Sequence, residues 1–121
     1  MNKAVTRSKG FRVFAHAQPM DMRKGFDALP EVVREGLGRD PQQGDLFLFV
    51  NRKQNYCKVL WWDGEGYCLF VKRLDTGVFP VPWEGDGEEF PLTAKDLQLF
   101  LSGKRAGYLG IGSSASSERA A

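Results

Sequence analysis

Residues 56–74 read YCKVLWWDGEGYCLFVKRL, two largely apolar runs joined by the polar segment DGEG. Aromatic and β-branched residues on both sides of such a segment predict a β-hairpin with a two-residue turn. If Gly64 and Glu65 form the loop, Asp63 lies opposite Gly66 and the numbers of every later pair sum to 129. The turn therefore fixes the register of the hairpin and the face on which each side chain lies.

The predicted register gives the hairpin two faces of different composition. One face is mostly apolar, and we assign it to the core beneath the helices. Its residues are Cys57, Val59, Trp61, Cys68, Phe70 and Lys72. The other face mixes aromatic rings with cations. Its residues are Tyr56, Lys58, Leu60, Trp62, Tyr67, Leu69, Val71 and Arg73. The two cysteines are roughly 13 Å apart at about 3.3 Å per residue, which is too far for a disulfide.

Further strands are predicted on both sides of the hairpin. Residues 11–17 and 45–51 are strand-like runs bounded by turn residues, and residues 89–92 form a short third run. Residues 78–83 contain two prolines, which donate no hydrogen bond to a neighbouring strand, so this segment is an edge strand or an extended arm. Together with the hairpin, these runs predict an antiparallel sheet of about five strands.

An N-terminal-half helix is predicted from about residue 22 to residue 37. Asp21 is the expected N-cap, Gly38 the expected C-cap, and Pro30 predicts a kink or a restart in the middle. Asp27 follows Arg23 by four residues, so we expect these two side chains to pair across one helical turn. The apolar residues at helical spacing are Met22, Phe26, Leu29, Val33 and Leu37.

A second helix is predicted near the C-terminus. Thr93 is its expected N-cap, Asp96 completes a capping box, and Gly103 ends the helix. The fold class is therefore α+β, with one helix from the N-terminal half and one C-terminal helix.

Composition indicates one domain. The chain has 121 residues, of which 42% are hydrophobic and 26% charged, as in ordinary globular proteins. We expect a flexible basic N-terminus at 1–10, a single domain at 11–102, and a flexible tail rich in Gly, Ser and Ala at 103–121. No run approaches the roughly 20 apolar residues of a spanning helix, and no signal peptide is evident. We therefore expect a soluble cytoplasmic protein with no membrane contact.

Charge is distributed unevenly along the sequence. From Lys3 to Leu74 there are 13 Lys or Arg against 8 Asp or Glu, a balance of +5; from Asp75 to Gln98 there is one Lys against six acids, a balance of −5. Clustered cations are what a phosphate backbone requires, so this asymmetry favours a polyanion-binding surface. Solvated faces of an ordinary domain are the alternative.

Catalytic residue types are scarce. His16 is the only histidine, the two cysteines form no zinc pattern, and no glycine-rich phosphate loop is present. We expect no metal and no cofactor. Asp21, Asp27 and Asp63 could serve a metal-dependent nuclease. Each also has a simpler role, as a helix cap, as an ion-pair partner or in a turn, so a nuclease is the weakest of the alternatives.

A nucleic-acid surface accounts for more of the sequence. Arg23 and Lys24 would lie at the start of a helix, where free N–H groups favour a phosphate. Trp62 and Tyr67 offer rings on which bases can stack. The predicted DNA-binding residues are Arg23, Lys24, Arg52, Lys53, Lys58, Trp62, Tyr67, Lys72 and Arg73.

Several of these segments together resemble one protein family. DMRKGFD at 21–27, LGRDPQQGDLFLFVNR at 37–52, KVLWWDGEGYCLFVKRL at 58–74 and GVFPVPW at 77–83 are similar to accessory proteins of insertion sequences of the sixty-six type. These are also called TnpB-like or second-open-reading-frame proteins. The likeness covers about residues 12–102, and Pro30 departs from the pattern. The matching positions are Asp21, Met22, Arg23, Lys24, Phe26, Asp27, Trp61, Trp62, Asp63, Gly64, Gly66, Lys72 and Arg73.

The resemblance implies a small bacterial protein encoded beside a transposase and needed for efficient transposition. It supplies no catalytic residues, and the chain is too short for the RNA-guided nuclease that shares the TnpB label. We expect a non-enzymatic accessory factor that contacts DNA or a transposase–DNA complex. The alternative is a protein-interaction module that binds the transposase, or another accessory protein of the same element, through the aromatic face and the acidic loop Glu84–Glu89. The sequence leaves the oligomeric state open.

Overall fold

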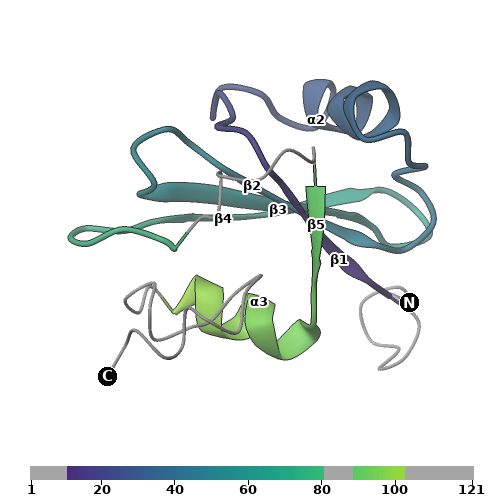
Figure 1. Ribbon diagram of the computed structural model, residues 1–121. Helices are drawn as coiled ribbons and strands as arrows, with labels where there is room; N and C mark the ends of the chain where they lie inside the picture. The colour runs from purple at the N-terminus through teal and green to yellow at the C-terminus, as the bar shows by residue number, and fades with distance from the viewer. Residues whose placement is uncertain (1–10, 81–88, 103–121) are drawn as a thin grey trace.

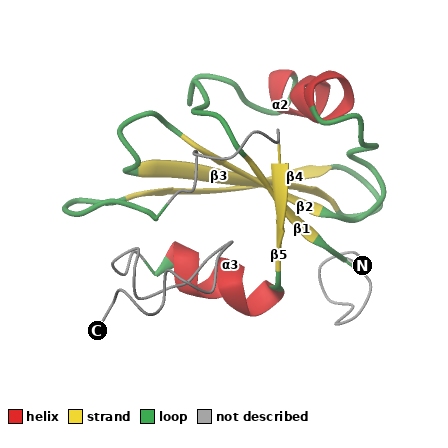
Figure 2. Ribbon diagram, viewed as in Figure 1, coloured by secondary structure: helices red, strands yellow, loops and turns green. Residues whose placement is uncertain are grey.

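A computed structural model describes residues 11–80 and 89–102 of the chain. It is an α+β fold in which one sheet lies between two helical layers (Figure 1 and Figure 2). The elements in chain order are β1 (Val13–His16), α2 (Ala28–Glu31), the π-helix η1 (Val32–Gly36), β2 (Leu46–Val50), β3 (Tyr56–Trp62), β4 (Tyr67–Arg73), β5 (Glu89–Leu92) and α3 (Ala94–Leu101).

The sheet has the strand order β4-β3-β2-β1-β5 and is mixed. β1 pairs with β2 in parallel, with Val13 opposite Leu46, and the remaining neighbours pair antiparallel. The prediction of an antiparallel sheet is therefore wrong at one pair of strands. The reason lies in the connection, because α2 and η1 carry the chain back along the sheet before β2 begins, as in a strand–helix–strand unit.

The hairpin formed by β3 and β4 has the predicted register. Trp62 lies opposite Tyr67, and Tyr56 lies opposite Arg73 at the other end. Asp63 closes the turn, because its carboxylate accepts hydrogen bonds from the backbone N–H groups of Glu65 at 2.8 Å and Gly66 at 3.0 Å. Gly64 has a φ of 102°, a conformation that glycine adopts without the steric penalty of a side chain.

Both faces of the sheet are buried, whereas only one was predicted to be. Figure 1 shows α2 on one side of the sheet and α3 on the other. The predicted core face packs under α3, where Phe79 stacks on Phe100 with ring centroids 5.0 Å apart. The opposite face packs under α2 and η1, with Leu60 fully buried. Its core consists of Phe14, Met20, Leu29, Val33, Phe47, Phe49 and Leu60.

The N-terminal-half helix begins at Ala28, six residues later than predicted. Asp21 caps no helix; its carboxylate accepts the Arg23 N–H at 2.9 Å and thereby forms a turn. Pro30 is the third residue of α2, where an N–H has no partner within the helix, so the proline costs no hydrogen bond. Gly38 has the predicted left-handed conformation after the helix, with a φ of 65°.

The C-terminal helix α3 begins as predicted. The Thr93 hydroxyl accepts the Asp96 N–H at 2.9 Å, and the Asp96 carboxylate accepts the Thr93 N–H at 3.3 Å, which completes the capping box. Leu97 and Phe100 are buried against the sheet. Gly103, the predicted end of this helix, lies outside the described residues.

The remaining predictions can be compared only where the chain is described. Strand β5 lies where a short strand was predicted. Of the proline-rich segment, residues 78–80 form no strand, and Phe79 donates its N–H to the Gln54 carbonyl at 2.6 Å. The predicted N-terminal extension, most of the acidic loop and the tail from 103 lie outside the described residues. Within the described ranges, no helix has the length and apolar character needed to cross a membrane.

The two cysteines are free, in agreement with the predicted register. Cys57 is fully buried in the core under α3, and this burial raises its pKa to about 12. Cys68 is half-buried, and its pKa is also raised, by burial and by the neighbouring Asp63 carboxylate. Both side chains therefore remain neutral thiols at physiological pH.

Candidate nucleic-acid interface

A loop of residues 20–27, here called the motif loop, is held over the sheet by one buried cation. Lys58 is only 9% exposed, and its ammonium group donates to the carbonyls of Met22 and Lys24, both at 2.7 Å. Among the described residues this ammonium has no carboxylate partner. Lys58 was predicted to contact DNA, but it faces inward and shapes the loop instead.

Within the motif loop, Asp21 and Arg23 form an exposed ion pair. The Arg23 guanidinium donates to both carboxylate oxygens of Asp21, at 2.7 Å in the shortest contact. Hydrogen bonds from the Arg23 side chain and backbone hold the pKa of Asp21 well below its usual range. Arg23 was predicted to pair with Asp27 across a helical turn. That pair is absent because residues 21–27 are not helical.

Three separate segments bring cations to the same end of the sheet. The motif loop joins the end of β2, where Met20 donates its N–H to Val50. The turn between β2 and β3 lies at this end, as does the end of β4, where Leu74 donates its N–H to Asn55 (left in Figure 1). We name this region the cationic end; its cations are Arg23, Lys24, Arg52, Lys53 and Arg73.

Most cations of this end have no acidic partner. In the described part of the chain, Lys24, Arg52, Lys53 and Arg73 form no ion pair. The last three are exposed, and Lys24 is half-buried. Only Arg23 is neutralised, by Asp21.

Lys72 precedes Arg73 in β4 but lies on the face of the sheet that α3 covers, so we do not count it among the cations of the cationic end. Its ammonium donates to the Leu101 carbonyl at 2.6 Å, in the last turn of α3. A cation there satisfies a free carbonyl and interacts favourably with the negative end of the helix dipole. Lys72 therefore stabilises the helix on the far face, and the prediction that it joins the other cations at one surface is wrong.

The aromatic pair also lies elsewhere. Trp62 and Tyr67 pack edge to face with centroids 4.9 Å apart, at the turn end of the hairpin. Arg73 lies six positions after Tyr67 in β4, which corresponds to roughly 20 Å along the strand. The Tyr67 hydroxyl accepts hydrogen bonds from Arg34 at 3.3 Å and Gln42 at 3.4 Å. The structure therefore does not bring these rings to the predicted cations.

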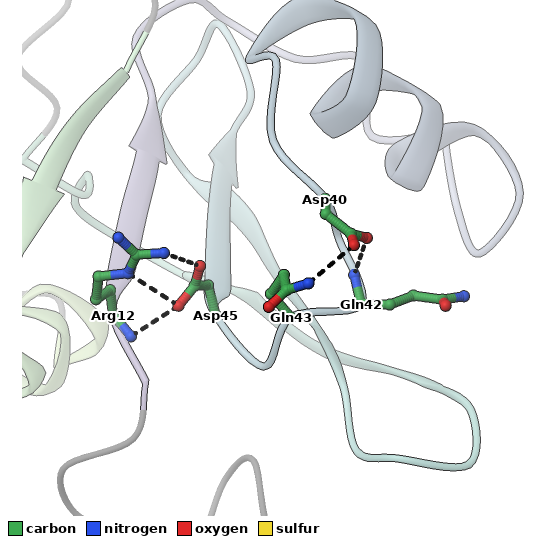
Figure 3. Close-up of polar contacts among 5 residues, drawn as sticks. All are labelled: Arg12, Asp40, Gln42, Gln43 and Asp45. Atoms are coloured by element: carbon green, nitrogen blue, oxygen red, sulfur yellow. Dashed lines mark hydrogen bonds and ion pairs between the residues drawn. The ribbon is translucent and has the colours of Figure 1, made fainter.

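At this opposite end of the sheet, cations are neutralised. Arg12 donates its backbone N–H and its guanidinium to Asp45, a carboxylate that is buried at the start of β2 (Figure 3). The shortest contact is 2.9 Å. Nearby, Asp40 accepts the Gln42 N–H and the Gln43 side-chain amide, and these bonds lower the pKa of Asp40 (Figure 3).

Two further arginines at this end also contact side chains of the same chain. Arg34 pairs with Glu31 at 2.7 Å, and the Arg39 guanidinium lies 3.7 Å from the centroid of the Phe14 ring. A guanidinium over an aromatic face is a favourable cation–π contact. We name this region the paired end; its cations are Arg12, Arg34 and Arg39.

The motif loop contains an exposed aromatic residue that the sequence pattern did not predict. Phe26 was placed on the buried side of a helix, yet it is 55% exposed. It borders two hollows, one of about 550 Å³ that extends to Pro30 and Tyr67, and one of about 510 Å³ along the loop itself. The signal available in the sequence was Gly25 next to an Asp-x-Arg turn, which disfavours a helix at this point.

The acidic residues considered for a nuclease do not form a site. Asp21 is paired at the cationic end, Asp63 closes the hairpin turn at the other end, and Asp27 borders a hollow. No group of three or more His, Cys, Asp or Glu able to hold a metal ion occurs among the described residues. His16 contacts the Gln18 carbonyl and packs beside Phe49.

The chain is similar in sequence to one known protein family and to two proteins of one bacterial species. Residues 11–108 match the family model described as IS66 Orf2 like protein. The chain is 41% identical over 92 residues to the uncharacterized protein y4hO of Sinorhizobium fredii, covering 76% of this chain and 79% of that protein. It is 35% identical over 96 residues to the uncharacterized protein y4jC of the same species, covering 79% and 81%. No solved structure matches the chain.

Proposed function

Because the chain belongs to the family of IS66 Orf2-like proteins, which are insertion-sequence accessory proteins, we propose that it is a non-enzymatic factor for DNA transposition. In this proposal the cationic end contacts DNA, either directly or within a transposase–DNA complex. The DMRK segment that characterises the motif loop is part of the contact surface.

The convergence of unpaired cations is the observation that supports DNA contact. Lys24, Arg52 and Arg73 come from three separate segments, and each lacks an acidic partner within the described ranges. Unpaired cations that share a surface repel one another and lower stability slightly, whereas a phosphate backbone neutralises them and releases its counterions. Asp21 and Asp75 only partly offset the positive charge of this end.

The experiment compares two double variants with the same loss of charge. Arg52→Ala/Lys53→Ala removes two cations from the cationic end, and Arg34→Ala/Lys95→Ala removes two exposed cations elsewhere. Binding to a duplex carrying the terminal inverted repeat of the element is measured by fluorescence anisotropy over a series of salt concentrations. The first variant should lose affinity, and its slope of log K against log salt should fall by roughly 2 units, about 0.9 per phosphate contact.

The control variant should keep the slope of the unmodified protein. Equal losses in both variants would show that only net charge matters and would contradict a defined DNA surface. Absence of binding at about 50 mM salt, where such electrostatic contacts are strong, would contradict direct DNA contact altogether.

The exposed Phe26 favours a second candidate function, a protein-interaction module that binds the transposase. An aromatic residue beside Pro30, Tyr67 and the Arg34–Glu31 pair has the composition typical of a protein interface centre. The acidic loop that the sequence assigned to this role lies mostly outside the described residues.

A pull-down tests this alternative. The protein is isolated from cells carrying the complete element, with and without DNase. Phe26→Ala should reduce transposase recovery after DNase, and Val78→Ala, which removes a comparably exposed apolar side chain elsewhere, should not. Recovery that is lost on DNase treatment would instead favour association through DNA.

A further inference from the structure

The outer edge of β4 presents a regular row of backbone groups. Asp63 donates its N–H to Gly66, and Leu74 donates its N–H to Asn55, so both ends of the β3–β4 ladder are hydrogen-bonded pairs. In an antiparallel ladder such pairs alternate with pairs whose backbone groups point away. The residues whose N–H and C=O groups point outward from the sheet are Tyr67, Leu69, Val71 and Arg73.

This edge lacks most of the features that usually protect an edge strand. Natural edges are blunted by proline, by bulges, by charged side chains or by a very short strand. The charged residues of β4 lie only at its end, and one of them, Lys72, binds the Leu101 carbonyl. Tyr67–Arg73 contains neither proline nor glycine, and its seven residues pair with β3 without a bulge. Phe70 and Val71 are 41% and 47% exposed, on opposite faces of the strand. Nothing among the described residues pairs with the edge.

The charges along the edge identify the partner that fits it. The strand begins beside the acidic turn of Asp63 and Glu65, with a net charge of −2, and ends with Lys72 and Arg73 followed by Asp75, with a net charge of +1. A second copy placed antiparallel brings its acidic turn to the basic end of the first copy, and the same match recurs at the other end. A parallel copy would instead place like charges side by side, which is unfavourable.

Two antiparallel copies can form backbone hydrogen bonds only in registers that place outward-facing residues of one copy opposite outward-facing residues of the other. The register that uses the whole strand pairs Tyr67 with Arg73 and Leu69 with Val71, and places Phe70 opposite Phe70 of the second copy. Phe70 then forms a pair without backbone hydrogen bonds, in which the side chains approach most closely. Aromatic pairs at such positions stabilise sheets.

We propose that two copies of this chain associate through their β4 edges, antiparallel and centred on Phe70, into one continuous sheet. The backbone groups of four residues on each copy become hydrogen-bonded, and the exposed apolar side chains of Phe70 and Val71 become covered. Arg73 lies at the border of this interface and of the cationic end. For that reason the DNA-binding test uses other cations, and the two proposals can fail independently.

The test uses the expectation that Phe70 of one copy lies opposite Phe70 of the second copy. Phe70→Glu and Phe70→Lys each place like charges opposite one another, so each variant alone should dissociate roughly tenfold more readily than the unmodified protein. Mixing the two variants places Glu opposite Lys and should restore association. Val78→Lys is the control, because it adds a charge at an equally exposed apolar residue outside the edge.

Sedimentation velocity of the full chain over a dilution series gives the dissociation constants, and circular dichroism verifies that each variant is folded. Association of the unmodified protein, loss in each Phe70 variant and recovery in the mixture are the expected results. A protein that stays monomeric at its highest soluble concentration would overturn the proposal. So would Phe70 variants that associate like the unmodified protein, or a mixture that stays dissociated.

Discussion

The lysines and arginines at the two ends of the sheet differ in whether they have partners within the chain. At the paired end, Arg12 binds the buried carboxylate of Asp45, Arg34 binds Glu31, and Arg39 lies over the Phe14 ring. At the cationic end, four of the five cations have no acidic partner in the described ranges. At the first end every one of the three cations is engaged within the chain, and the carboxylate of Asp45 is buried.

The difference shows where the charges serve the fold and where they are available to a partner. A cation that binds acceptors of its own chain is part of the folded structure, as Arg12 is through the buried carboxylate of Asp45. Exposed cations left unpaired at one end contribute little to stability, since surface charges rarely do. Exposed, unpaired cations are the groups that a polyanion such as DNA requires of a binding surface. Variants at either end of the sheet test this difference.

The largest effect is expected from Lys58→Met, which removes the buried ammonium group that binds the backbone of the motif loop. Two hydrogen bonds from a charged donor are lost, so the free energy of unfolding should fall by about 2 to 4 kcal/mol. Urea denaturation measures this loss. The control Lys53→Met, at an exposed lysine, should change it by less than about 0.5 kcal/mol. Equal effects of the two variants would mean that Lys58 does not hold the loop.

A smaller loss is expected from Asp45→Asn at the paired end. The variant keeps one oxygen acceptor but removes the charge opposite Arg12, so unfolding should become easier by about 1 to 2 kcal/mol. Asp40→Asn is the matched control, and because Asp40 is exposed its effect should be much smaller. The freed Arg12 should not raise DNA affinity. A clear rise would show that DNA also contacts the paired end.

Asp21→Asn should act on binding more than on stability. It removes the one carboxylate that neutralises a cation of the motif loop, so Arg23 becomes available to phosphate. The slope of log K against log salt should steepen by about 0.9, one additional contact. Anisotropy titrations measure the slope, and Asp27→Asn is a control that removes an acid without freeing Arg23. An unchanged slope would place Arg23 outside the DNA contact.

The smallest effect concerns the acid range of pH. Hydrogen bonds from Arg23 lower the pKa of Asp21 in the folded protein below its value in the unfolded chain. The pair therefore contributes its full stability above the usual range of Asp, and this contribution disappears only as pH falls below that range. Arg23→Ala should return the pKa of Asp21 toward its ordinary value. Carboxyl-carbon NMR titration of the two proteins measures the difference, and identical curves would contradict the pairing.

Local patterns predicted much of this fold. The register of β3 and β4 follows from the turn at Gly64, and the start of α3 follows from Thr93 and Asp96, because each signal acts over a few residues. The prediction that a helix begins near Met22 was wrong because a different local signal, the turn formed by Asp21 and Arg23, acts there. An Asp-x-Arg turn competes with a helix for the same backbone groups, and apolar spacing alone does not reveal which one prevails.

The candidate site depends on long-range contacts that sequence patterns do not reveal. Lys58 and Lys53 look alike in the sequence, yet Lys58 is buried because the motif loop, more than thirty residues earlier, crosses over it. Lys72 is likewise engaged by a distant segment, because its ammonium donates to the Leu101 carbonyl of α3. The three cationic segments could be identified in the sequence. They meet at one end of the sheet because β1 and β2 run parallel, so that the chain leaving β1 lies beside the end of β2, and the antiparallel prediction did not include this pairing.

The strand order also has a consequence for how the chain assembles. β2, β3 and β4 are joined by short turns, whereas β5 pairs with β1 by bringing Leu92 beside Val13. Contacts between distant residues form more slowly than local ones, so we expect β5 and α3 to dock last. During synthesis, the second edge of β1 therefore stays unpaired until residues 89–92 have been made. A product that stops before residue 89 would keep that edge open and expose Phe79 to solvent, and it would be a substrate for proteases and a source of aggregation.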